Sequence, residues 1–141
     1  GMVFYMMKNI VAIFVGGALG ALLRYYINLG TITMIFPLGT LIENLLGSFL
    51  LGLLTGFLLK TTIKEWLKVG LGVGVCGGFT TMSTLAADAN ILFINGSLES
   101  LTIYILASVF GGILLATIGV YFGWKIGIKA MDKNKKVLKH G

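Results

Sequence analysis

A run of hydroxyl side chains in the middle of an apolar stretch is the first feature that could do chemistry. Residues 80–84 read Thr-Thr-Met-Ser-Thr and follow closely on the glycine pair Gly77-Gly78. This composition favours an unwound turn, because glycine loses the most backbone entropy on ordering and threonine is stiff at χ1. A helix broken inside a bilayer is tolerated only where its free backbone groups line an ion site, a cavity or another protein surface. The alternative is a glycine-rich packing helix that never unwinds.

The other polar side chains inside apolar stretches are mostly hydroxyls, with one amide. They offer O–H and N–H donors with few fixed cations, which is what a small dehydrated anion needs to pass without being trapped. The alternative is that each hydroxyl bonds back to its own helix or to a neighbour. Because the set converges on one broken segment, we favour an ion pathway. Its members are Asn44, Thr80, Thr81, Ser83, Thr84, Tyr104 and Ser108.

The residues that an enzyme would need are absent from the sequence. There is no group of His, Cys and carboxylate residues at metal-ligand spacing, no Ser–His pairing and no phosphate-binding glycine loop. The lone Cys76 excludes an internal disulfide framework, and His140 lies in a basic tail. We therefore predict that the protein is not an enzyme.

Four apolar stretches must position these polar groups. With 57% hydrophobic and only 11% charged residues, the 141-residue chain is predicted to be an integral membrane protein with one domain. Each stretch is long enough to cross a hydrocarbon core of about 30 Å. We expect an all-α membrane protein with four transmembrane helices, the third broken near mid-membrane. The spans are about 6–29, 38–59, 65–92 and 100–124, followed by a basic tail, 125–141, that is expected to fray.

Positive charge is concentrated on one predicted side of the membrane. Ten of the eleven cationic residues are lysines that fall at the N-terminus, in the second loop or in the C-terminal tail. Arg24 is the exception, and Glu99 lies on the opposite side with it. Cytoplasmic loops are enriched in Lys and Arg, so both termini are predicted to be cytoplasmic.

Small residues at four-residue spacing predict close helix packing. Gly70, Gly74 and Gly78 share one face of the third span, which lets another backbone approach closely. Arg24 follows a similar glycine face in the first span and either snorkels to the interface or anchors the structure. We assign structural roles to Arg24, Gly47 and Gly78.

Three motifs make the chain similar to a known family. Residues 16–25 (GGALGALLRY), 37–52 (PLGTLIENLLGSFLLG) and 77–85 (GGFTTMSTL) resemble the CrcB/Fluc family of fluoride channels, and the resemblance extends from about residue 11 to residue 123. It implies a passive, fluoride-selective channel of the plasma membrane that exports cytoplasmic fluoride. It also implies a dimer with subunits antiparallel in the membrane and two fluoride pathways.

The resemblance also assigns roles to individual residues. The backbone carbonyls of Gly77 and Thr80 would hold a structural sodium ion at the dimer centre. Asn44 would be the pore-lining amide. The full set of implied pathway positions is Asn44, Met82, Ser83, Thr84, Asp88, Tyr104 and Ser108.

The chain departs from the family pattern at several positions. Met82 and Leu85 stand where the family has two phenylalanines, and we expect Met82 to line the pathway and Leu85 to pack. Glu43 would repel an anion, so it either faces elsewhere or is protonated. The lysine bias suggests a subunit with one orientation, paired with a paralogue, although a homodimer stays open.

Two other functions remain open at this stage. A small multidrug exporter is also a four-helix antiparallel dimer, and Glu43 would then be its proton-coupled site; this reading leaves the Gly77–Thr84 segment without a role. The chain could instead be a non-conducting partner subunit, which the loss of both phenylalanines supports.

Overall fold

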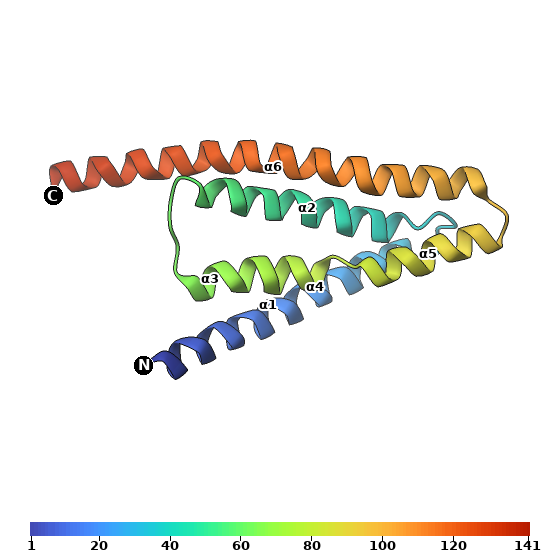
Figure 1. Cartoon of the computed structure of the whole chain (residues 1–141), viewed down its shortest axis with the longest axis horizontal. Helices are drawn as coiled ribbons and strands as arrows, with labels where there is room; N and C mark the ends of the chain where they lie inside the picture. The colour runs from blue at the N-terminus through green and yellow to red at the C-terminus, as the bar shows by residue number, and fades with distance from the viewer.

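The computed structural model describes residues 1–141 and is entirely helical (Figure 1). Four of its helical stretches are long and apolar enough to cross a membrane, and the third of these is interrupted. This confirms the predicted fold class of a four-span, all-α membrane protein. The elements in chain order are α1 (Met2–Thr31), α2 (Leu38–Leu58), α3 (Glu65–Val69), η1 (Gly70–Cys76), α4 (Gly77–Phe79), α5 (Met82–Ile94) and α6 (Leu98–His140).

Helices α2 and α6 lie side by side along the whole of α2 (Figure 1). Glycines on both helices make the contact: Gly52 and Gly56 on α2, and Gly119 and Gly123 on α6. A Cβ atom added at any of the four would collide with a backbone carbonyl of the other helix. Small residues therefore let these two backbones touch, as they do in many membrane helix pairs.

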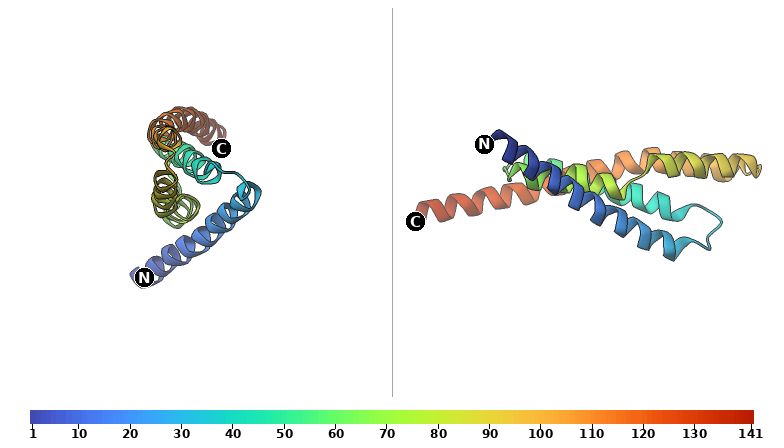
Figure 2. Two further views of the ribbon diagram at one scale, coloured as in Figure 1. Left: turned by 90° about the vertical axis from the view of Figure 1, so that its right-hand side faces the viewer. Right: turned by 90° about the horizontal axis from the view of Figure 1, so that it is seen from below.

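Helix α1 crosses the third span at an angle and packs on η1 and α4 (Figure 2). The predicted glycine face of the third span is confirmed at this contact. A Cβ on Gly74 would lie 2.9 Å from the Ile13 carbonyl oxygen, and one on Gly78 would collide with the Gly17 carbonyl. The structure adds a feature that the sequence did not predict: η1 is a π-helical segment of seven residues. Such wide turns are rare and are frequently found at functional sites.

Both termini and the α2–α3 connection lie at the same end of the molecule (Figure 1). Lysines stack on aromatic rings there, with Nζ-to-centroid distances of 5.5 Å for Lys8 on Trp66 and 5.8 Å for Lys60 on Trp124. Such pairs are typical of a membrane–water interface. The basic tail continues α6 as one helix to His140, whereas the sequence suggested that it frays.

A single subunit has almost no core. Only 16 of its 141 residues are buried, and large apolar side chains such as Phe14 and Ile113 are mostly exposed on the helix surfaces. An outward apolar surface is expected for helices that face lipid or another subunit. The chain is therefore a multi-pass membrane protein.

Candidate ion pathway at the broken helix

The third span breaks between α4 and α5, at two residues with extended backbones. Thr80 has φ −86° and ψ 156°, and Thr81 has φ −150° and ψ 123°. Thr81 then caps α5, because its hydroxyl oxygen accepts the Thr84 N–H at 3.1 Å. Threonine is a good N-cap residue, so the threonine pair ends one helix and starts the next. The break predicted from the glycine and threonine run lies at its threonines.

Asn44 of α2 holds the break in place. Its Nδ2 donates to the Thr81 carbonyl at 2.9 Å, and its Oδ1 accepts the Thr81 N–H at 2.7 Å. These two bonds satisfy backbone groups that the interruption removes from the helix ladder. An amide NH₂ carries two hydrogens, so the second N–H of Asn44 is free for another acceptor.

Two carbonyl groups at the break lose their usual donors. In a continuous α-helix, the Thr81 N–H would bond the Gly77 carbonyl and the Thr84 N–H would bond the Thr80 carbonyl. Here the Thr81 N–H goes to Asn44 and the Thr84 N–H goes to the Thr81 hydroxyl. The carbonyls of Gly77 and Thr80 therefore lack the N–H donors that a continuous helix would give them.

Arg24 reaches the break from α1. Its Nε donates to the Gly78 carbonyl at 3.1 Å, across 54 residues of chain. Arg24 is only partly exposed, and the bond ties α1 to α4. This bond is the contact expected of an anchor for the broken segment, which is one of the two roles considered for Arg24.

A cleft of about 610 Å³ opens beside the break, between α2, the third span and α6. Of the residues expected from the sequence to form the pathway or support it, seven line it: Asn44, Gly47, Gly77, Thr80, Thr81, Met82 and Ser108. Leu85, which was expected to pack, also lines the cleft, and so does Ser48, which was not predicted. Ser48 lies one turn from Asn44 on α2, and this spacing is the signal that could have pointed to it.

The hydroxyls of the cleft are engaged with their own helices. Ser48 donates to the Asn44 carbonyl at 2.8 Å, Ser108 to the Tyr104 carbonyl at 2.7 Å, and Thr80 to the Cys76 carbonyl at 2.9 Å. These bonds turn oxygen lone pairs, and not hydrogens, toward the cleft. An anion would therefore have to draw each hydroxyl hydrogen away from a carbonyl, whereas the free Asn44 N–H is available at once.

Asp88 and Tyr104 form a second polar cluster with Thr40. One carboxylate oxygen of Asp88 accepts the Thr40 hydroxyl at 2.8 Å and the Tyr104 hydroxyl at 3.2 Å. Tyr104 is fully buried, and its ring forms a T-shaped pair with that of Phe36 at a centroid distance of 5.8 Å. None of the three residues in the cluster lines the cleft. Thr40 was not among the predicted residues because its contact with Asp88 joins distant parts of the chain.

Glu43 is completely enclosed within the subunit. Its exposed fraction is 0%, and neither carboxylate oxygen has a hydrogen-bond partner. It does not line the cleft, although its sequence neighbour Asn44 does. Adjacent helical positions point about 100° apart, which accounts for the difference. Glu43 thus faces away from the cleft, which is one of the two possibilities considered for it from the sequence; the other was that it is protonated.

Met82, Ser83 and Thr84 begin α5 and differ in their surroundings. Met82 lines the cleft and is 77% exposed. Ser83 is exposed, and its hydroxyl lies 3.3 Å from that of Thr81. Thr84 is half-buried and accepts a hydrogen bond from the Thr81 hydroxyl at 3.0 Å. The first turn of α5 therefore presents one exposed apolar side chain and two hydroxyls close to the break.

Comparison with known proteins identifies relatives over most of the chain. The model of the family described as CrcB-like protein, Camphor Resistance (CrcB), matches residues 11–120. The chain is 55% identical to the fluoride-specific ion channel FluC 2 of Halalkalibacterium halodurans over 122 residues, which are 86% of this chain and 90% of that protein. It is 46% identical to FluC 2 of Bacillus subtilis, covering 85% of this chain and 91% of that protein. It is also 37% identical to FluC of Bacteroides fragilis, covering 83% of this chain and 97% of that protein.

Proposed function

Since the chain belongs to the CrcB family of fluoride ion channels, we propose that it exports cytoplasmic fluoride passively along the cleft beside the broken helix. Three of the expected track residues, Asn44, Met82 and Ser108, line the cleft, whereas Ser83, Thr84, Asp88 and Tyr104 lie outside its lining and would have to extend the track beyond it. The family assignment removes the alternative of a small multidrug exporter. It also agrees with the position of Glu43, which is enclosed and away from the cleft.

The observation that carries this proposal is the free N–H of Asn44 at the cleft. Fluoride is small and strongly hydrated, so a pathway must offer hydrogen-bond donors that replace water without holding the ion too tightly. The Asn44 amide is fixed by two bonds to Thr81 and keeps one donor for the ion. The nearby hydroxyls of Ser48 and Ser108 would rotate from their carbonyls as the ion passes.

The substitution Asn44→Asp tests the pathway. An aspartate retains the acceptor for the Thr81 N–H, but it removes the amide donor and adds a negative charge to the cleft. We expect fluoride efflux from reconstituted liposomes to fall by more than about a hundredfold, the scale that a like charge a few ångströms away sets at an intermediate dielectric. Size-exclusion chromatography should show unchanged assembly.

Thr55→Val is the matched control for Asn44→Asp. The Thr55 hydroxyl is exposed on the same helix and bonds only the Leu51 carbonyl, so its loss should leave the efflux rate unchanged. Wild-type flux through Asn44→Asp would place the pathway elsewhere. If the wild-type chain alone shows no efflux, it is a non-conducting partner and needs a second subunit to form the channel.

The second subunit is proposed to lie antiparallel in the membrane, as a second copy or a paralogue. Two features support a partner at the break: the cleft is open, and nothing lies within 4 Å of the position of a Cβ on Gly77. The lysine-rich end favours one orientation for this subunit, in the plasma membrane with both termini cytoplasmic. A cysteine introduced at Ser97 should be labelled only from outside. Equal labelling from both sides would indicate that copies insert in both orientations.

A structural sodium ion at the break is part of the same proposal. The Gly77 and Thr80 carbonyls fit a monovalent cation because the N–H groups that would normally bond them are diverted, and because hard cations prefer oxygen ligands. The bound ion would supply positive charge that offsets these carbonyl dipoles at the dimer centre. Purification with N-methylglucamine replacing sodium should lower the efflux rate, and added sodium should restore it. Full activity after exhaustive sodium removal would contradict this site.

A further inference from the structure

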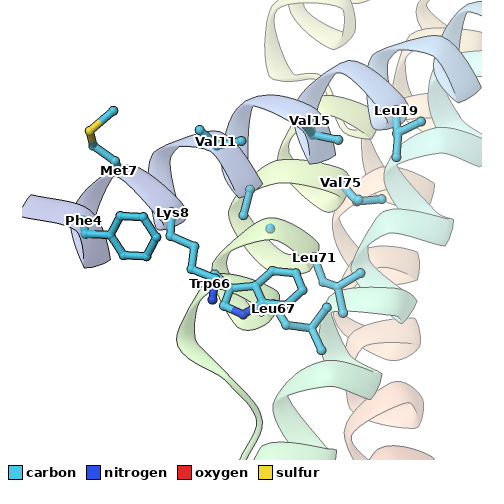
Figure 3. A pocket seen from close by; sticks show the side chains of 12 residues that line it. Phe4, Met7, Lys8, Val11, Val15, Leu19, Trp66, Leu67, Leu71 and Val75 are labelled. Atoms are coloured by element: carbon cyan, nitrogen blue, oxygen red, sulfur yellow. The ribbon is translucent and has the colours of Figure 1, made fainter.

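A second hollow lies on another face of the molecule, between the N-terminal half of α1 and the α3–η1 segment (Figure 3). This α1–α3 groove has a volume of about 650 Å³, and ten of its twelve lining residues are hydrophobic. Val11 and Val15 form one wall, and Leu67 and Leu71 form the other. The groove shares no lining residue with the cleft at the break. It is therefore a feature separate from the candidate pathway.

The groove carries polar groups only toward one end. Lys8 extends from α1 toward the indole of Trp66, with its Nζ 5.5 Å from the ring centroid (Figure 3). The Trp66 Nε1 donor is buried and has no hydrogen-bond partner. This N–H is enclosed and is not reached from the groove, so the donor that a ligand in the groove meets is the exposed Lys8 ammonium. An ammonium only donates hydrogen bonds and carries positive charge, which favours an anionic ligand.

The length of the groove indicates what kind of group is attached to that anion. From Lys8 to Leu19, the α1 wall runs for about 17 Å at 1.5 Å per residue. That is close to half of a hydrocarbon core of about 30 Å, which is the depth of one lipid leaflet. Lys64 and Lys68 flank Trp66 in the sequence and add positive charge at the same end.

From these features we propose that the α1–α3 groove binds one anionic phospholipid. An acyl chain lies along Val11, Val15 and Leu71, and the phosphate group lies at Lys8 Nζ. The lysines at this end favour a headgroup with net negative charge over a zwitterionic one, whose ammonium group cancels the charge of its phosphate. This site is separate from the ion pathway, so it stands whether or not fluoride follows the cleft.

Tryptophan quenching by brominated lipids tests the site on the full chain. The variant Trp124→Phe leaves Trp66 as the one tryptophan, because the chain has two. This variant is reconstituted in phosphatidylcholine liposomes. Half-maximal quenching of its fluorescence should need a roughly fivefold lower mole fraction of dibromo-phosphatidylglycerol than of dibromo-phosphatidylcholine, which is the effect of about one juxtamembrane lysine. Lys8→Gln in this background should bring the two lipids close to equality, and raising the salt concentration should narrow the difference.

Two matched controls distinguish a lipid bound in the groove from the lipids that surround the whole protein. Lys139→Gln removes a tail lysine and should leave the Trp66 preference unchanged. The variant Trp66→Phe reports from Trp124, which also lies near a lysine but outside the groove, and its preference should be smaller. Equal preferences at the two tryptophans, or a preference that survives Lys8→Gln, would overturn the proposal. Absence of quenching by either lipid would overturn it as well, since a second protein chain would then cover the groove.

Discussion

Two pairs of packed helices in this subunit use the same small residues with different results. In the α2–α6 pair, glycines bring two continuous helices into backbone contact. In the pair made by α1 and the third span, glycines make equally close contacts, but the third span is π-helical and then broken. What differs is the supply of outside hydrogen bonds: Arg24 and Asn44 bond backbone groups at the break. Close packing alone does not unwind a membrane helix; partners for the freed groups must also be present.

The largest effect is expected from adding a methyl group at the backbone contacts. Gly123→Ala and Gly20→Ala each place a Cβ against a carbonyl of the neighbouring element, which cannot move aside as a side chain could. We expect each to lower the free energy of unfolding by about 1–3 kcal/mol, the usual cost of overpacking. Thermal unfolding followed by size-exclusion chromatography measures this.

Gly112→Ala provides the control, because its Cβ would meet only the Ser48 hydroxyl at an ordinary 3.6 Å. If the comparison between the two helix pairs is right, Gly20→Ala channels that still fold also conduct less, because the added Cβ displaces the third span and with it the break. Gly123→Ala channels that still fold should conduct at the wild-type rate. Equal losses of conduction in both variants would contradict the distinction.

A medium effect is expected at the threonine that caps α5. Thr81→Val removes the hydroxyl that accepts the Thr84 N–H, and the loss of an N-cap costs about 0.5–2 kcal/mol. Thr117→Val removes a hydroxyl that bonds the Ile113 carbonyl on the continuous helix α6, where the backbone needs no cap. Thermal midpoints of the two variants should therefore differ, with Thr81→Val lower. Identical midpoints would mean that the break does not depend on its cap.

The smallest effect on stability is expected at Met82, which is 77% exposed in the subunit. We expect Met82→Phe and Met82→Ala to unfold like the wild type but to conduct differently. Phe supplies a ring edge with partial positive charge and should preserve or raise fluoride efflux, whereas Ala should change it. If both variants match the wild type in the same liposome assay, Met82 only fills space.

The sequence predicts the features that depend on local composition. Four apolar spans and a break at the Gly-Gly and Thr-Thr run follow from hydropathy and backbone preferences, and both are present. The π-helical turns of η1 were not predicted, because they occur where α1 packs on the third span rather than from a residue pattern. The contact between Thr40 and Asp88 joins residues 48 apart in the sequence and has no local signal.

Chemistry at the candidate pathway was harder to predict than its location. Asn44 was expected to offer its amide to an ion, and the structure uses most of that amide to hold Thr81. Likewise, Ser108 was expected as a donor, and its hydrogen goes to its own helix. Residue type shows that a donor exists, but only the three-dimensional arrangement shows whether the donor is already engaged.

The length of α6 has a practical consequence for imaging so small a protein. Its 43 residues extend for about 65 Å at 1.5 Å per residue, roughly twice the thickness of the hydrocarbon core. The last turns, from Asp132 onward, are exposed, and α6 extends beyond the other helices at this end (Figure 1). A globular marker fused in frame after His140 would therefore lie outside the bundle, on the side to which α6 extends. In electron micrographs, two markers on opposite faces of the particle would reveal an antiparallel pair, and two on one face a parallel pair.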